Sequence, residues 1–151
     1  MGMDVCGIKP VSETGSYFRN NVWWWRPLWQ YCCVVGKDLI DEDTSAGCCY
    51  NEGNGLNAND AAKLGVTLQA KIADGHTELW KNERELHLES LPDENCCVCN
   101  NNNRGYKKKK ECKSCDCKGT VDSWQKSYPF DIENVENFSN FLINSGGFKV
   151  W

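Results

Sequence analysis

The core of this protein is expected to form around the stretch Tyr17-Phe18-Arg19-Asn20-Asn21-Val22-Trp23-Trp24-Trp25-Arg26-Pro27-Leu28-Trp29. Pro27 suits the first turn of a helix, where its missing N–H would have no partner in any case. That helix would run to about Val35 and end at Gly36, because glycine commonly terminates helices. Three adjacent tryptophans cannot all face one core, so at least one of them is expected to be exposed or covered by another group.

Outward from this stretch, periodic apolar residues and capping residues predict the remaining elements. The expected elements are strands over residues 4–8 and 148–151 and helices after the caps Asn57, Thr77 and Asp131. Residues 41–57 are expected to form a polar loop. The sequence therefore predicts an α+β fold, namely a small, mostly helical domain with a short sheet and an inserted zinc-ribbon-like β-hairpin.

Residues 93–121 differ in character from the rest of the chain. Cysteine, asparagine and lysine replace the apolar periodicity there, so this segment cannot form a core without help. The predicted organisation has three parts. Residues 1–92 form the N-terminal part of the α+β domain, residues 93–121 form a zinc-binding hairpin insertion, and residues 122–151 form a C-terminal helix and strand that pack back on the domain.

Composition limits the classes of function. With 151 residues, of which 40% are hydrophobic and 25% charged, the chain has the make-up of a folded domain rather than a disordered one. A formal net charge of −4 argues against a general nucleic-acid binder, which usually carries a basic excess. The sequence has no signal-peptide pattern and no stretch long enough to cross a bilayer. We therefore expect a cytoplasmic protein with no membrane partner.

Eleven cysteines need an explanation. Their number is odd and the expected compartment is reducing, so a disulfide framework explains them poorly. Cys96 and Cys99 form one C-x-x-C pair, and Cys112 and Cys115 form another after a twelve-residue gap. Each pair places two thiolates on one tight turn, where both reach the same tetrahedral ion. The sequence therefore predicts one structural zinc ion bound by these four cysteines.

Redox or iron–sulfur chemistry is the alternative use of these pairs. Redox C-x-x-C motifs usually stand at a helix start in a βαβ setting, which this segment lacks, and we favour zinc. Cys97 and Cys117 are then spare thiols, unless one of them replaces a neighbour as a ligand.

The second pair continues as Cys112-x-x-Cys115-x-Cys117-x-Gly119, which resembles the C-x-x-C-x-G-x-G repeat of the DnaJ-type cysteine-rich zinc domain. Cys117 stands where the repeat has its first glycine, and Gly119 matches the second. Cys96-x-x-Cys99, followed by four asparagines, resembles a more degenerate copy. Asparagine tolerates positive φ better than most residues. The resemblance covers residues 96–119 and implies zinc binding only, since the chain has no J-domain signature.

Two vicinal pairs, Cys32-Cys33 and Cys48-Cys49, would form a second metal site if the helix and the loop that carry them meet. Such cysteines are more often small core residues, and we favour that interpretation. The two histidines are His76 and His87. A cysteine–histidine enzyme would need one of them, and no nucleophile motif supports such a pair.

The cluster Trp23-Trp24-Trp25-Arg26 is the main candidate for a contact surface. Exposed tryptophans stack on nucleobases or anchor protein partners, and burial of two of the three in the core is the competing interpretation. Arg104 and the lysine run that includes Lys107 and Lys108 are candidates for phosphate contacts, although such a run on a hairpin tip is usually a solvated edge.

Much of the chain resembles a group of small proteins carried by phages and prophages. The resemblance lies in residues 1–5, 17–29, 53–56 and 127–148. It implies a viral accessory role in the cytoplasm of a host cell, and it implies no specific activity.

These observations lead to one main expectation and two alternatives. Small size, acidity and the absence of catalytic motifs favour a non-enzymatic, zinc-stabilised binding protein that engages a host or phage protein, with inhibition of a host defence system as one use. The first alternative is a nucleotide or nucleic-acid binding protein that uses the tryptophan cluster and residues 104–110. The second is a thiol- or metal-dependent enzyme.

Overall fold

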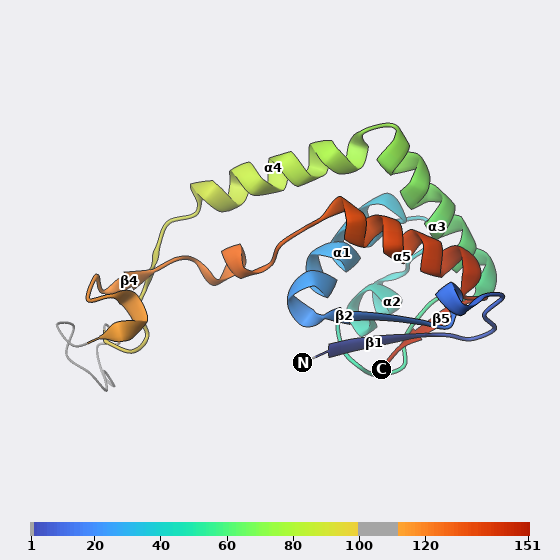
Figure 1. The fold of residues 1–151 in the computed structure, drawn as a ribbon, viewed down its shortest axis with the longest axis horizontal. Coiled ribbons are helices and arrows are strands. Elements are labelled where there is room, and N and C mark those ends of the chain that lie inside the picture. The colour runs from blue at the N-terminus through green and yellow to red at the C-terminus, as the bar shows by residue number, and fades with distance from the viewer. Residues whose placement is uncertain (1, 100–111) are drawn as a thin grey trace. The chain divides into compact units, whose positions relative to one another are not determined.

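The computed structural model describes residues 2–99 and 112–151 (Figure 1). It divides into two compact units, the first made of Met1–Asn82 with Tyr128–Trp151 and the second of Glu83–Ser127. Helices predominate, and the strands form small antiparallel sheets. The fold is therefore of the predicted α+β class. The predicted boundaries at residues 93 and 121 lie inside the second unit.

The described residues form five strands and five α-helices. The strands are β1 (Gly2–Gly7), β2 (Tyr17–Asn21), β3 (Glu94–Asn95), β4 (Thr120–Val121) and β5 (Phe148–Val150). The helices are α1 (Val22–Val35), α2 (Glu42–Gly47), α3 (Ala58–Ala73), α4 (His76–Ser90) and α5 (Ile132–Asn144), with short 3₁₀ turns at Glu13–Gly15, Lys113–Cys115 and Trp124–Ser127. No helix in the described ranges is long and apolar enough to cross a membrane.

The first unit is built on a three-stranded antiparallel sheet in the order β2-β1-β5. Its central strand pairs Val5 with Phe18 on one side and with Val150 on the other. The segment 53–56 runs along the outer edge of β5, where the backbone N–H of Gly53 donates to the Val150 carbonyl oxygen at 2.8 Å. Helix α5 packs along α3 and contributes its apolar side to the core over the sheet (Figure 1).

The aromatic stretch divides between β2 and α1 at Asn21. The side-chain oxygen of Asn21 accepts hydrogen bonds from the backbone N–H groups of Trp23 and Trp24 at 3.0 and 3.1 Å, which caps α1. The prediction that Pro27 lies in the first turn is therefore wrong, because the helix begins five residues earlier, at Val22. The predicted stop is confirmed, since the N–H of Gly36 bonds to the Cys32 carbonyl oxygen at the C-cap.

The predicted capping residue is correct for the start of α3 and wrong for the start of α4. Asn57 caps α3 as expected and accepts hydrogen bonds from the backbone of Asn59 and Asp60, both at 3.0 Å. Thr77 does not cap α4, because that helix begins at His76 and the Thr77 hydroxyl is buried.

The expected polar loop over residues 41–57 contains helix α2, which the sequence did not predict. Asp41 caps α2, and its carboxylate accepts a hydrogen bond from the Thr44 N–H at 2.7 Å. Asx-type capping of this kind stabilises even a single short helix.

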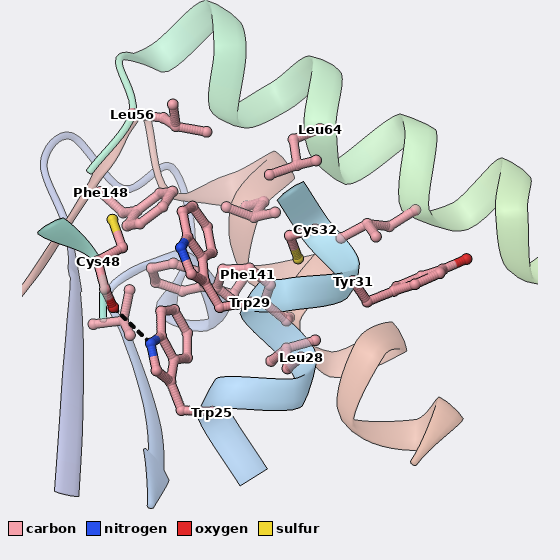
Figure 2. Packing of buried hydrophobic residues seen from close by; sticks show 14 of the residues in the cluster. Trp25, Leu28, Trp29, Tyr31, Cys32, Cys48, Leu56, Leu64, Phe141 and Phe148 are labelled. Carbon is pink, nitrogen blue, oxygen red and sulfur yellow. Dashed lines mark hydrogen bonds between the residues drawn. The ribbon is translucent and has the colours of Figure 1, made fainter. Parts of the chain in front are cut away.

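The core of the first unit forms around α1 (Figure 2). The rings of Trp25 and Trp29 stack with centroids 5.6 Å apart, and both side chains are buried. Phe138 and Phe148 pack edge-on against this stack from α5 and β5. Two of the three adjacent tryptophans differ sharply in burial, since Trp25 is 0% exposed and Trp23 is 46% exposed.

The vicinal cysteine pairs come from segments that do meet in this core. Cys32 and Cys48 are fully buried, and Cys33 and Cys49 pack partly buried beside them. Within the part of the chain that the structure describes, no three of these thiols lie close enough to share an ion. Cys32 and Cys48 therefore serve the core, as favoured from the sequence.

Candidate metal centre and aromatic surface

The four predicted metal ligands lie between the two strands of a short ladder in the second unit, at the end where β3 stops and β4 begins. Strand β3 pairs antiparallel with β4, with Glu94 opposite Val121. Cys96 follows β3 directly, and its N–H extends the ladder by donating to the Gly119 carbonyl oxygen at 2.9 Å. Residues 100–111, where the predicted hairpin turns, lie outside the described residues, and the zinc-ribbon-like hairpin stays a prediction.

The structure brings the sulfur atoms of Cys96, Cys99, Cys112 and Cys115 within 4.8 Å of one another. The Sγ atoms of Cys96 and Cys112 are 3.8 Å apart, and those of Cys99 and Cys115 are 3.6 Å apart. Cys99 is partly buried and the other three are buried. Four thiols at these distances can hold one metal ion.

Backbone groups around the second pair support the sulfur atoms. The N–H of Gly119 donates to the Sγ atom of Cys115 at 3.2 Å, a contact that stabilises a thiolate and fixes its orientation. Asp116 and Cys117 adopt left-handed conformations, with φ of 48° and 63°. Cys117 thus has the kind of backbone conformation that glycine adopts most readily.

Ionisation of Cys96 and Cys99 is linked. Backbone N–H groups of Val98 and Cys99 lower the pKa of Cys96 to about 7. Burial, followed by hydrogen bonds that the Cys99 thiol donates to its neighbours, raises the pKa of Cys99 to about 12. A thiolate at Cys96 therefore disfavours ionisation of Cys99, because two negative charges this close together repel one another. A bound cation would remove that repulsion.

Cys97 and Cys117 are exposed and stand outside the cluster. The Sγ atom of Cys117 contacts the Cys112 carbonyl oxygen at 3.8 Å. The arrangement is that of two spare thiols beside a complete set of four.

The residues of the predicted contact cluster differ in burial, because they lie on different faces of α1. Trp25 is buried, so its candidacy for partner binding is wrong: its indole N–H donates to the Cys48 carbonyl oxygen inside the core. Trp24 is half-buried, whereas Trp23 and Arg26 are exposed. The face of α1 that turns to solvent is therefore the one that carries Trp23 and Arg26.

Tyr128 completes this surface, although the sequence did not predict it as a contact residue. Its ring lies 4.8 Å from the Trp23 ring, centroid to centroid. The Nη1 atom of Arg26 donates to the Tyr128 hydroxyl at 3.1 Å, with the guanidinium 5.8 Å from the ring centroid. We call Trp23, Arg26 and Tyr128 the aromatic surface. The other predicted contact residues, Arg104, Lys107 and Lys108, lie outside the described residues.

His76 lies beside a phenol, and His87 lies on the surface of α4. The Nδ1 atom of His76 lies 3.0 Å from the Tyr31 hydroxyl, which also contacts the Thr77 hydroxyl at 2.9 Å. Burial raises the pKa of Tyr31, so the phenol stays neutral and bridges α1 to the start of α4. His87 is exposed.

No protein-family model matches the chain, and neither the search of curated proteins nor that of solved structures found a match. The resemblances to phage proteins and to the DnaJ-type repeat are neither supported nor contradicted by these comparisons.

Proposed function

We propose that this protein is a non-enzymatic binding protein whose second unit is held together by one structural zinc ion. The spacing of the four sulfur atoms carries the proposal. A tetrahedral zinc ion with Zn–S bonds of about 2.3 Å sets its sulfur ligands about 3.8 Å apart. The measured separations are 3.8 Å for Cys96 and Cys112 and 3.6 Å for Cys99 and Cys115.

The same distances weigh against the other uses of these cysteines. A disulfide requires an S–S separation of about 2.05 Å, and neither pair is that close. An iron–sulfur cluster places bridging sulfides and several iron atoms between its thiolates, which would spread the four sulfur atoms beyond the 4.8 Å within which all of them lie here. A single tetrahedral ion fits, and zinc is the ion that four thiolates bind most commonly.

The metal's role is structural because the second unit has little else to stabilise it. Its buried apolar cluster consists of the cysteines themselves with Val98 and Val121 packed against them. Small units of this kind usually gain their folding free energy from metal binding. All four coordination positions would be filled by cysteine, which leaves none for a substrate or a catalytic water.

The aromatic surface is the site that we propose for the partner. Tryptophan, tyrosine and arginine are the residues that most often dominate binding energy at protein interfaces. Here the contacts among Trp23, Arg26 and Tyr128 hold the three side chains in place before binding, which lowers the entropic cost of association. The resemblance to phage proteins points to a host or phage protein as the partner, with interference with host defence as one outcome.

Elemental analysis of the purified chain tests the metal centre. We expect about one zinc per chain, lost when any of Cys96, Cys99, Cys112 or Cys115 is changed to serine. The matched controls are Cys97→Ser and Cys117→Ser, which remove neighbouring exposed thiols and should keep the metal. Zinc retained in all four ligand variants, or iron in place of zinc, would overturn this part of the proposal.

The binding role is tested with a purified partner. Candidates captured from host or phage lysates would be produced pure, and their Kd measured against the wild-type chain, Trp23→Ala and Trp151→Ala. Trp151 is 52% exposed and lies outside the aromatic surface, so it is a matched control. Loss of a buried interface tryptophan weakens binding by about 2 kcal/mol or more, so we expect at least about a thirtyfold rise in Kd for Trp23→Ala alone.

Two results would contradict a non-enzymatic protein binder. One is turnover of a nucleotide or peptide that a single substitution abolishes. The other is salt-sensitive binding of oligonucleotides that is lost with Trp23→Ala, which would favour the nucleic-acid alternative.

A further inference from the structure

The backbone of β2 directs some of its hydrogen-bonding groups away from the sheet. Asp4 and Trp151 exchange two hydrogen bonds, at 3.1 and 2.7 Å, so the backbone of Asp4 faces β5. Backbone groups alternate sides along a strand, so Val5 faces β2, where its register partner is Phe18. It follows that Tyr17 and Arg19 present their N–H and C=O groups to the side of β2 opposite β1.

That side of β2 is an open edge. Among the described strands, β2 pairs with β1 alone and stands last in the order β2-β1-β5. The other edge of the sheet is covered, because the segment 53–56 pairs with β5. An uncovered strand edge is a template for pairing with another chain.

The side chains at this edge are mixed in character. Phe18 points to the core, where its ring lies 5.0 Å from Phe138, yet it is only partly buried. Tyr17 is exposed, and the side chain of Arg19 is 72% exposed. Both lie on the solvent face of the sheet beside Asp4, which accepts a hydrogen bond from the Tyr17 hydroxyl.

We propose that β2 pairs antiparallel with β2 of a second copy of this chain, about a two-fold axis at Phe18. In this register the outward backbone groups of Tyr17 meet those of Arg19 in the other copy. Four backbone hydrogen bonds form, and each arginine stands opposite a tyrosine, a favourable cross-strand pair. Phe18 then stands opposite its own copy on the core face, which completes its burial.

The edge segment is complementary to itself, which favours a second copy of this chain as the occupant and Phe18 as the centre of the register. Pairing centred on Arg19 would place two guanidinium groups directly opposite each other, which is destabilising. A two-fold contact uses the same patch on both copies. With Phe18 at the two-fold axis, Tyr17 of each copy faces Arg19 of the other, so the segment is complementary to a second copy of itself.

Sedimentation equilibrium over a concentration series of the full chain tests the dimer. We expect the apparent mass to rise from that of one chain to that of two. Arg19→Pro removes an outward N–H without touching a bond to β1, and proline is tolerated on edge strands. Two hydrogen bonds per dimer are lost and their carbonyl partners are left unpaired. The dissociation constant of the dimer should therefore rise at least about thirtyfold.

Arg19→Ala is the matched control, since it keeps the N–H and loses only the side chain. It should weaken the dimer by less than about tenfold. Backbone amide exchange in the wild-type chain gives a readout that needs no variant. The amides of Tyr17 and Arg19 should exchange more slowly as concentration rises, while that of an exposed turn residue such as Gly75 stays constant.

Several outcomes would overturn the proposal. They are one-chain mass at every concentration, a dimer that Arg19→Pro leaves intact, or amide exchange at Tyr17 and Arg19 that does not depend on concentration. Protection of these amides only when a different protein is added would identify an extended segment of that protein as the occupant, and would also overturn pairing with a second copy.

Discussion

The indole N–H of Trp25 donates to the backbone carbonyl oxygen of Cys48 at 2.7 Å inside the core (Figure 2). A second bond of the same kind runs from the Trp29 indole N–H to the Ser45 carbonyl oxygen at 3.0 Å. The two stacked tryptophans of α1 therefore satisfy carbonyl groups at the end of α2, where helix carbonyls have no partner within the helix. The tryptophans act as structural donors at one end of a short helix as well as core residues.

Trp25→Phe is expected to lower the free energy of unfolding by about 1–3 kcal/mol beyond the loss of ring volume, because it leaves a buried carbonyl unpaired. Urea unfolding followed by circular dichroism measures the change. The control is Trp23→Phe, an exposed position where we expect a change within about 0.5 kcal/mol. Equal effects at the two positions would contradict the structural role of the Trp25 indole.

Local signals in the sequence predict part of this fold and the four-cysteine cluster. The cap at Asn57 and the two C-x-x-C pairs depend on residues within a few positions of one another, and such spacings can be read directly. Which tryptophan is buried depends on where α1 begins, and Asn21 decides that through a capping bond. Asparagine is a favoured cap, so this signal was present in the sequence but competed with Pro27.

Long-range contacts explain most of what the sequence does not reveal. Tyr128 meets Arg26 across 102 positions of the chain, and no periodicity or motif links them. The same holds for Cys32 and Cys48, which share a core because α1 and the end of α2 pack together. Contacts of this kind follow from the packing of whole elements, which local patterns do not encode.

Metal removal is expected to affect the two units differently. The main hydrophobic cluster lies entirely in the first unit, whereas the second has only the cysteine cluster. A chelator should therefore expose residues 83–127 to proteases while the first unit stays resistant. Limited proteolysis with mass mapping of the fragments is the measurement, and added zinc should restore protection. Early cleavage within residues 2–82 would count against this division of stability.

Acid should weaken two hydrogen bonds at the starts of helices, those that the carboxylates of Asp41 and Asp74 accept at α2 and α4. Hydrogen bonds from the backbone of Thr44 and of His76 lower the pKa of these carboxyl groups below the ordinary value of 3.8. As the pH falls, the unfolded chain takes up protons before the folded one, so this stabilisation is present above the ordinary value and is lost as the pH falls through the folded pKa.

The double variant Asp41→Asn, Asp74→Asn isolates that contribution, because asparagine also caps helices but does not titrate. Its unfolding free energy should fall less than that of the wild type from about pH 6 to about pH 3. Loss of a bound metal in acid would affect both proteins alike, so the difference between their pH profiles reports on the carboxyl groups. Parallel profiles would mean that the two caps contribute no pH dependence.

Thiol reactivity should separate the cysteines into buried and exposed classes. Burial raises the pKa of Cys48 to about 12 and also raises that of Cys32, so both are protonated and shielded at neutral pH. Cys97 and Cys117 are exposed and should be alkylated first when the folded, metal-loaded chain is treated at about pH 8. Pulsed alkylation with peptide mass mapping measures the order. Alkylation of Cys32 or Cys48 as fast as Cys97 in the folded chain would show that the core around α1 opens far more readily than its packing implies, and would reopen the case for a second site at the vicinal pairs.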